Sequence, residues 1–143
     1  ERFWRRAKSQ NFINGRLMAD ICLNDLSDFR EWEVTPPVNQ NLPVESFIGR
    51  FDGNGHSISG LYSENGYGLV ERNRGQISDL TLKSSRIAGS ASVSGICQRN
   101  EGQISGCVFQ GELESTLRRP PAEGRIAGIC GQNEGILWEC GYR

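Results

Sequence analysis

The stretch GICQRNEG at residues 95–102 returns almost unchanged as GICGQNEG at residues 128–135. A third copy, GLVERNRGQISDL, lies at residues 68–80, and all three copies place an Asn two positions before a Gly. Copies a few tens of residues apart are typical of proteins that stack one structural unit on another.

Short β-rich pieces separate the glycines of each copy. In residues 80–82 and 107–109 the side chains follow the two-residue period of a strand. Helices are disfavoured because each glycine inside a helix would cost about 1 kcal/mol. Asn-x-Gly supplies a corner, since both residue types tolerate positive φ. Strand, corner and strand in repetition predict an all-β parallel β-helix, a solenoid whose coils lie about 4.8 Å apart.

Equivalent residues of successive coils are expected to stack in columns. GNGHSISGL at residues 53–61 is interpreted as a partial fourth copy that aligns with positions 77, 104 and 137. The step between coils then lengthens, which predicts surface insertions at residues 84–92 and 112–124. The predicted corner residues are Asn73, Asn100, Asn133, Gly75, Gly102 and Gly135. The predicted core columns are Ile58, Ile77, Ile104 and Leu137, and Leu61, Leu80, Cys107 and Cys140.

The N-terminal part is expected to close one end of the stack. Residues 1–57 are interpreted as an entry cap, first strands and a long loop, and residues 58–143 as the stacked coils of the same domain. The spacing of three apolar residues predicts a short amphipathic helix over the first coil: Phe3, Trp4 and Ala7. Alternation predicts a strand over residues 17–24, and three prolines predict a long ordered loop over residues 31–47.

These stretches, together with SFIGRFDGNGHSISGLY upstream, resemble the repeats of the GLUG-motif family. The resemblance covers residues 12–142, including the entry segment GRLMADICLND. The departures are Arg74, where the other copies have Glu, and the inserted Trp138. The resemblance implies a right-handed β-helix from a bacterial cell-surface or secreted protein, a class that includes IgA-protease-type and adhesin-like proteins. It also implies a non-catalytic stalk, spacer or adhesion module.

Composition narrows the classes of partner. Sixteen basic and seventeen acidic residues leave a net charge of −1, with no long block of like charge, which disfavours nucleic acid. No apolar run approaches the ~18 residues of a membrane span. We expect an extracellular or cell-surface location, as part of a larger bacterial protein.

Catalysis is not predicted. Lyases and hydrolases with this fold need acids and bases on one outward face of adjacent coils. The column of Asp79, Gly106 and Glu139 does not supply such a site. The sequence therefore predicts no enzyme and no cofactor. The alternative is an accessory, substrate-presenting domain of a secreted peptidase or carbohydrate-active enzyme, and a polysaccharide lyase is least favoured.

Two other motifs are assigned to structure. His56 is interpreted as a corner residue, and Asp25 and Asp28 as turn and cap residues. FDGNG at residues 51–55 is interpreted as a tight turn, because it lacks the alternating acids of a calcium loop.

The five cysteines include no CxxC pair, which disfavours a zinc site. Cys97 is expected to stack on Cys130, and Cys107 on Cys140. The spacing of coils would fit a disulfide, but parallel stacking points both Cβ atoms the same way. We expect these thiols to be free and buried.

Two regions are candidates for partners. Arg118 and Arg119, in the insertion at residues 112–124, suit a carboxylate-bearing glycan or an extracellular host protein. The strand edge after Cys140 is the other candidate, because an exposed edge favours edge-to-edge self-association.

Overall fold

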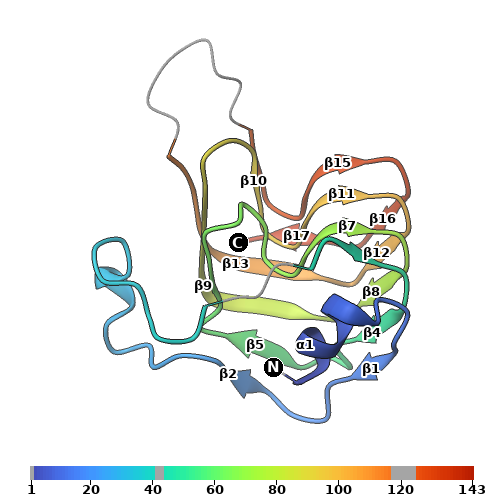
Figure 1. The fold of residues 1–143 in the computed structure, drawn as a ribbon, viewed down its shortest axis with the longest axis horizontal. Coiled ribbons are helices and arrows are strands. Elements are labelled where there is room, and N and C mark those ends of the chain that lie inside the picture. The colour runs from blue at the N-terminus through green and yellow to red at the C-terminus, as the bar shows by residue number, and fades with distance from the viewer. Residues whose placement is uncertain (1, 41–43, 117–124) are drawn as a thin grey trace.

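The computed structural model describes residues 2–40, 44–116 and 125–143 (Figure 1). The chain is mostly β, and every strand pair in these ranges is parallel. Sequence-distant segments lie side by side because each return of the chain adds one strand to the edge of each sheet. We call each such return a pass.

Three sheets hold most of the strands. The first contains, in spatial order, β1 (Gly15–Arg16), β4 (Arg50–Asp52), β8 (Gln76–Ser78), β12 (Gln103–Ser105) and β16 (Ile136–Trp138). The second contains β3 (Ser46–Phe47), β7 (Val70–Asn73), β11 (Cys97–Asn100) and β15 (Cys130–Asn133). The third contains β2 (Ile21–Cys22), β5 (Ser57–Ser59), β9 (Thr81–Gly89), β13 (Val108–Ser115) and β17 (Gly141–Tyr142), with β6 (Tyr62–Ser63) also paired to β9. A small fourth sheet pairs β10 (Val93–Ser94) with β14 (Ile126–Ala127).

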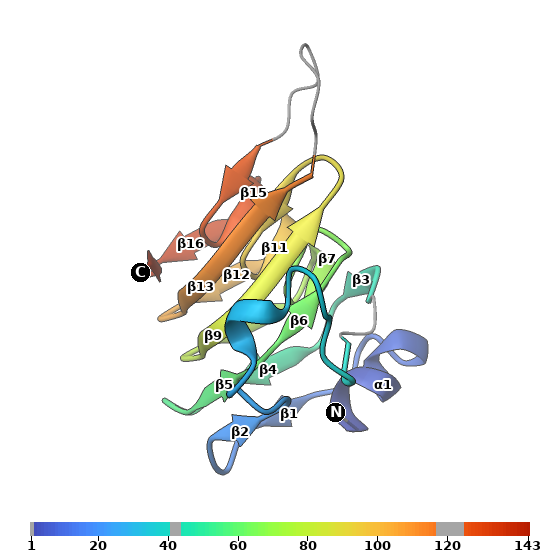
Figure 2. The same cartoon turned by 90° about the vertical axis from the view of Figure 1, so that its left-hand side faces the viewer.

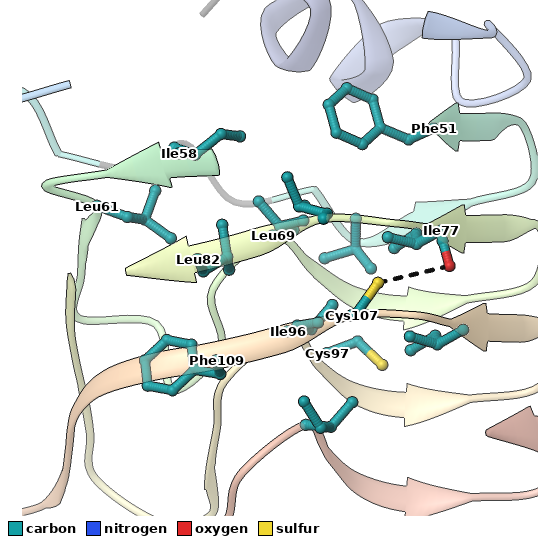
Figure 3. Close-up of a cluster of buried hydrophobic side chains, with 14 of the residues drawn as sticks. Phe51, Ile58, Leu61, Leu69, Ile77, Leu82, Ile96, Cys97, Cys107 and Phe109 are labelled. Carbon is teal, nitrogen blue, oxygen red and sulfur yellow. Dashed lines mark hydrogen bonds between the residues drawn. The ribbon is translucent and has the colours of Figure 1, made fainter. Parts of the chain in front are cut away.

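The core lies between the sheets, where the inward side chains of successive passes pack on one another (Figure 3). Ile77 on β8 and Ile104 on β12 are directly paired, and both are fully buried. Leu137 pairs with Ile104 on the next strand but is 41 % exposed, because no described strand lies beyond β16. Cys140 is likewise only partly buried. The inward column therefore reaches the surface at its last member.

Ile58 and Leu61 do not belong to the column predicted for them. The residue opposite Ile77 is Phe51, whereas Ile58 lies in the third sheet, opposite Leu82. Leu61 lies beside β9 in the same region, where its carbonyl accepts the Arg86 N–H at 2.8 Å. The partial copy at residues 53–61 thus belongs to a different side of the fold from the one predicted. Both residues are nevertheless buried.

The N-terminal helix α1 (Arg2–Ser9) confirms the predicted helix. Ala7 is fully buried, and the rings of Phe3 and Trp4 lie 5.0 and 4.8 Å from that of Phe51. The helix covers the N-terminal end of the core (Figure 1). Since β4, within residues 1–57, pairs with β8, the stacked strands begin before residue 58.

Two other predictions need correction. Residues 17–24 form no continuous strand, because the chain bends between β1 and β2. Residues 84–92 are not simply an inserted loop, since β9 runs to Gly89 along β13 (Figure 2). Ser84, with φ of 46°, and a register shift after Gln110 let both strands continue beyond the corner.

The loop that follows β2 folds back over the third sheet. It carries a short 3-10 helix, η1 (Phe29–Glu31), followed by Trp32, which is only 2 % exposed. The Trp32 ring meets that of Tyr62 edge to face at 6.0 Å. The loop thus adds an outer layer over β6. No helix in the described ranges has the length and apolar character needed to cross a membrane.

Candidate functional site

The predicted corner asparagines form a ladder of side-chain amides. Nδ2 of Asn73 donates to Oδ1 of Asn100 at 2.9 Å, and Nδ2 of Asn100 donates to Oδ1 of Asn133 at 2.8 Å. The Asn100 amide also donates to the carbonyl of Ile136 at 3.0 Å. Asn73 and Asn100 are fully buried, whereas Asn133 is exposed. These amides satisfy the backbone groups that the corner takes out of the strand ladders.

The corner glycines let successive passes approach closely. A Cβ atom on Gly75 would lie 2.0 Å from the carbonyl oxygen of Gly49, and one on Gly102 would lie 2.1 Å from that of Gly75. Gly135 stands in the same relation to Gly102. Bare backbone therefore forms the floor of a shallow groove of about 400 Å³ that runs across the passes.

Polar side chains line one side of this corner groove. Arg50, Gln76 and Gln103 are consecutive partners in the first sheet, so they form a row along the groove. Arg50 is exposed and makes no ion pair with any residue of the described ranges. Arg74 also lines the groove, with Nε 3.3 Å from the Glu101 carboxylate. The groove thus offers amides and an uncompensated guanidinium to a ligand.

An ion-pair network lies beside the groove. The Glu101 carboxylate is within 3.6 Å of Arg72 and within 3.2 Å of Arg99, and Nη2 of Arg99 is 2.6 Å from Glu134. Together with the Arg74–Glu101 pair, this network spans three passes. Each of these side chains is at least a quarter exposed, so each pair adds under about 1 kcal/mol.

A second polar cluster, on the third sheet, was missed by sequence reasoning. Arg86 is only 8 % exposed, and its guanidinium donates to Glu112 at 2.7 Å and also to Glu114. Tyr62, opposite Arg86 in the sheet, donates its hydroxyl proton to Glu64 at 2.6 Å. Burial and then Glu64 raise the pKa of Tyr62 to about 12, so this phenol stays protonated at neutral pH. The Arg86 guanidinium and the Tyr62 hydroxyl thus both donate to carboxylates of the cluster itself.

A further hollow lies under the loop after β2. It measures about 500 Å³ and is lined by Trp32, by Pro36 and Pro37, and by three carboxylates: Asp25, Asp28 and Glu31. The Asp25 carboxylate accepts the Ser27 N–H at 3.0 Å, which lowers its pKa and makes it a turn residue, as expected. Asp28 precedes η1 but makes no side-chain cap bond.

His56 and the FDGNG turn also have structural partners. Nδ1 of His56 is 3.3 Å from Oδ1 of Asp20, and the Ser57 N–H donates to the same oxygen at 2.8 Å. The Ser57 bond, followed by His56, lowers the pKa of Asp20. Asp52 accepts the N–H of Asn54, whose φ is 54°, as in a tight turn. The described residues hold no group of three or more His, Cys, Asp or Glu side chains suited to a metal ion.

All five cysteines are free in the structure. Cys97 pairs with Cys130 across β11 and β15. Cys97 and Cys107 are buried, whereas Cys130 and Cys140 are only partly buried. The proximity of the thiols of Cys107 and Cys140 to each other raises the pKa of Cys107 and lowers that of Cys140. The predicted partner residues Arg118 and Arg119 lie outside the described residues.

Comparison of this chain with models of protein families, with curated proteins and with solved structures finds no match.

Proposed function

We propose that this chain is a right-handed parallel β-helix of the GLUG-motif type. In this proposal it works as a non-catalytic stalk, spacer or adhesion module of a bacterial cell-surface or secreted protein. The parallel sheets support a solenoid, because each pass from β3 onward supplies one strand to each of three sheets. Right-handedness is supported by the near-universal hand of crossovers between parallel strands.

This proposal rests on the contacts that the repeated residues make between passes. The asparagines of the three copies bond to one another across the passes, and the glycines admit the backbone of the neighbouring pass. The repeat therefore encodes contacts between passes rather than a reacting centre. Such contacts hold the stacked passes together as an elongated unit, which is suited to keep other parts of a protein apart.

The corner groove is the surface that best suits adhesion. Arg50 provides a planar guanidinium for a carboxylate, and the amides of Gln76 and Gln103 both donate and accept hydrogen bonds. This row fits a linear, carboxylate-bearing glycan that lies along the groove. Because the groove crosses several passes, such a ligand would contact the repeat rather than one loop.

A glycan array that includes polyuronates tests this proposal. We expect the chain to bind acidic glycans, Arg50→Gln to weaken binding about tenfold, and Lys83→Gln to leave it unchanged. Lys83 is an exposed cation on the third sheet and serves as the matched control. Equal binding by Arg50→Gln and the unaltered chain would exclude the groove. Shortening of the bound polysaccharide over time would exclude the non-catalytic assignment.

The hollow under the loop after β2 favours a second candidate function, the accessory presentation of a substrate. Three carboxylates beside Trp32 and two prolines suit a basic, extended peptide. A Lys-rich peptide should then bind by calorimetry, and Glu31→Gln should weaken it while Glu71→Gln does not. Glu71 is an exposed carboxylate on β7, away from the hollow.

A further inference from the structure

Two cysteines occupy the same place in successive passes near the C-terminal end of the core. Cys107 joins β12 to β13, and Cys140 joins β16 to β17. The residues around them are paired in register: Ser105 with Trp138 before the cysteines, and Val108 with Gly141 after them. The two cysteine backbones are therefore neighbours at about the 4.8 Å spacing of parallel strands.

The thiols have equivalent surroundings. Sγ of Cys107 lies 3.4 Å from the Ser105 carbonyl oxygen and 3.8 Å from that of Ile77, in the previous pass (Figure 3). Sγ of Cys140 lies 3.3 Å from the Trp138 carbonyl oxygen and 3.6 Å from that of Ile104. Ile77 is one pass before Cys107, and Ile104 is one pass before Cys140. Both thiols are therefore displaced toward the preceding pass, which for Cys140 is the pass that holds Cys107.

We propose that Cys107 and Cys140 form an oxidisable dithiol, a site of thiol–disulfide exchange with small disulfides. Oxidation of this site would cross-link the last described pass to the pass before it. The inference does not depend on the proposed stalk or adhesion function, because it rests only on the stacking and accessibility of the two thiols.

Accessibility and acidity give the two thiols different roles. Cys107 is fully buried, whereas Cys140 is partly exposed and no described strand covers the outer edge of β17. The neighbouring Cys107 thiol lowers the pKa of Cys140, which favours ionisation of Cys140 over that of the buried Cys107. Cys140 is therefore the attacking sulfur, and Cys107 is the resolving one.

The reaction proceeds by two exchanges. The Cys140 thiolate attacks one sulfur of a small disulfide, forms a mixed disulfide and releases one small thiolate. Cys107 then loses its proton and attacks Sγ of Cys140, which releases the second small thiolate. Two protein thiols are oxidised to one disulfide while the small disulfide is reduced to two thiols, so electrons and protons balance.

The backbone positions permit the final bond. A disulfide needs Cβ atoms about 3.8 Å apart, so the two residues must approach by about 1 Å from the strand spacing. Both cysteines lie between strands, and the last pass has a described neighbour on one side only. Cys97 and Cys130, in contrast, lie within the paired strands β11 and β15. The cross-link is therefore expected at Cys107 and Cys140 first.

Oxidised glutathione is the probe for this site, with non-reducing peptide mapping by mass spectrometry as the readout. We expect one internal disulfide between Cys107 and Cys140, detected as the loss of two hydrogen atoms. Cys22, which is exposed and has no cysteine beside it in the described structure, should keep a glutathione adduct. It is the control for accessibility alone.

Variants separate the two steps. Cys107→Ala should convert the cross-link into a lasting glutathione adduct on Cys140, while Cys140→Ser should abolish both. Cys22→Ser should leave the cross-link unchanged, and circular dichroism should show that each variant is folded. If Cys107→Ala is unfolded, peptide mapping of the unaltered chain still tests the proposal. A lasting adduct on Cys140, no reaction at Cys140 while Cys22 reacts, or an earlier Cys97–Cys130 bond would overturn the proposal.

Discussion

Replacing Asn100 with Leu tests whether the amide ladder holds the passes together. Asn100 is fully buried, and Leu has a similar size but no polar atom. The substitution removes the bond accepted from Asn73 at 2.9 Å and the bonds donated to Asn133 at 2.8 Å and to the Ile136 carbonyl at 3.0 Å. Three hydrogen bonds in or next to the core are lost at once.

The expected loss follows from what replaces these bonds. Each is worth about 1 kcal/mol net, and a buried group left without a partner costs about 1–3 kcal/mol. The Asn73 amide keeps a bond to the Gln103 carbonyl at 3.2 Å, and Asn133 is exposed to water, so neither is fully stranded. We therefore expect Asn100→Leu to lower the free energy of unfolding by about 3 kcal/mol.

Urea unfolding followed by circular dichroism measures this difference, with Asn133→Leu as the matched control. Asn133 belongs to the same ladder but is exposed, so water can replace its bonds and the loss should be under about 1 kcal/mol. The slope of free energy against urea should be the same for all three proteins. Equal destabilisation by the two substitutions would refute the view that buried ladder amides stabilise the passes.

Other predictions concern the core, the corner and the third sheet. Ile104→Asp places an unpaired charge in the fully buried column and should unfold the chain, and a thermal midpoint within a degree or two of the original would contradict this. Gly75→Ala should cost more than about 2 kcal/mol in urea unfolding because its Cβ would meet the Gly49 carbonyl oxygen, whereas Gly141→Ala, which meets nothing, should be nearly neutral. The pKa of Tyr62 is raised from 10.0 to about 12, so its contribution to stability is complete below pH 10 and is lost as pH rises through about 12. Alkaline unfolding of Tyr62→Phe should lack this component, and an unchanged profile would contradict the assignment.

The register of the three strong copies could be predicted from the sequence. Asn73, Asn100 and Asn133 share the same neighbours in the chain, and the structure pairs them with one another. Each copy combines a strand with the Asn-x-Gly corner that ends it. The copies therefore indicate both where each strand lies and where the chain turns. The sequence of the last copy does not show that its residues are exposed. Their burial depends on whether another strand packs beyond them, and not on the repeat itself.

The pass that precedes the three strong copies was misplaced, because the spacing of two apolar residues, Ile58 and Leu61, does not mark its corner. The turn that matches Gly75 is Gly49, and Phe47 stands where the next pass has Asn73. The Gly-Arg-Phe-Asp stretch that begins at Gly49 corresponds to the Gly-Gln-Ile-Ser stretch that begins at Gly75. A pass that lacks the corner asparagine can therefore be recognised by its corner glycine. The backbone of the neighbouring pass comes so close to this position that no side chain fits there.

The cluster around Arg86 could not be found by alternation, for a physical reason. Strand periodicity assigns a face to each residue only while the backbone stays extended. Ser84, in a left-handed conformation, and the register shift after Gln110 both interrupt that period, so the outward residues change parity within β9 and β13. The same irregularities bring Arg86 opposite Glu112. The burial of Arg86 beside two carboxylates depends on this bend, which the polar residues of the segment do not indicate. Charged residues in a segment interpreted as an insertion can therefore be buried, as Arg86 is between its two ion pairs outside the repeat.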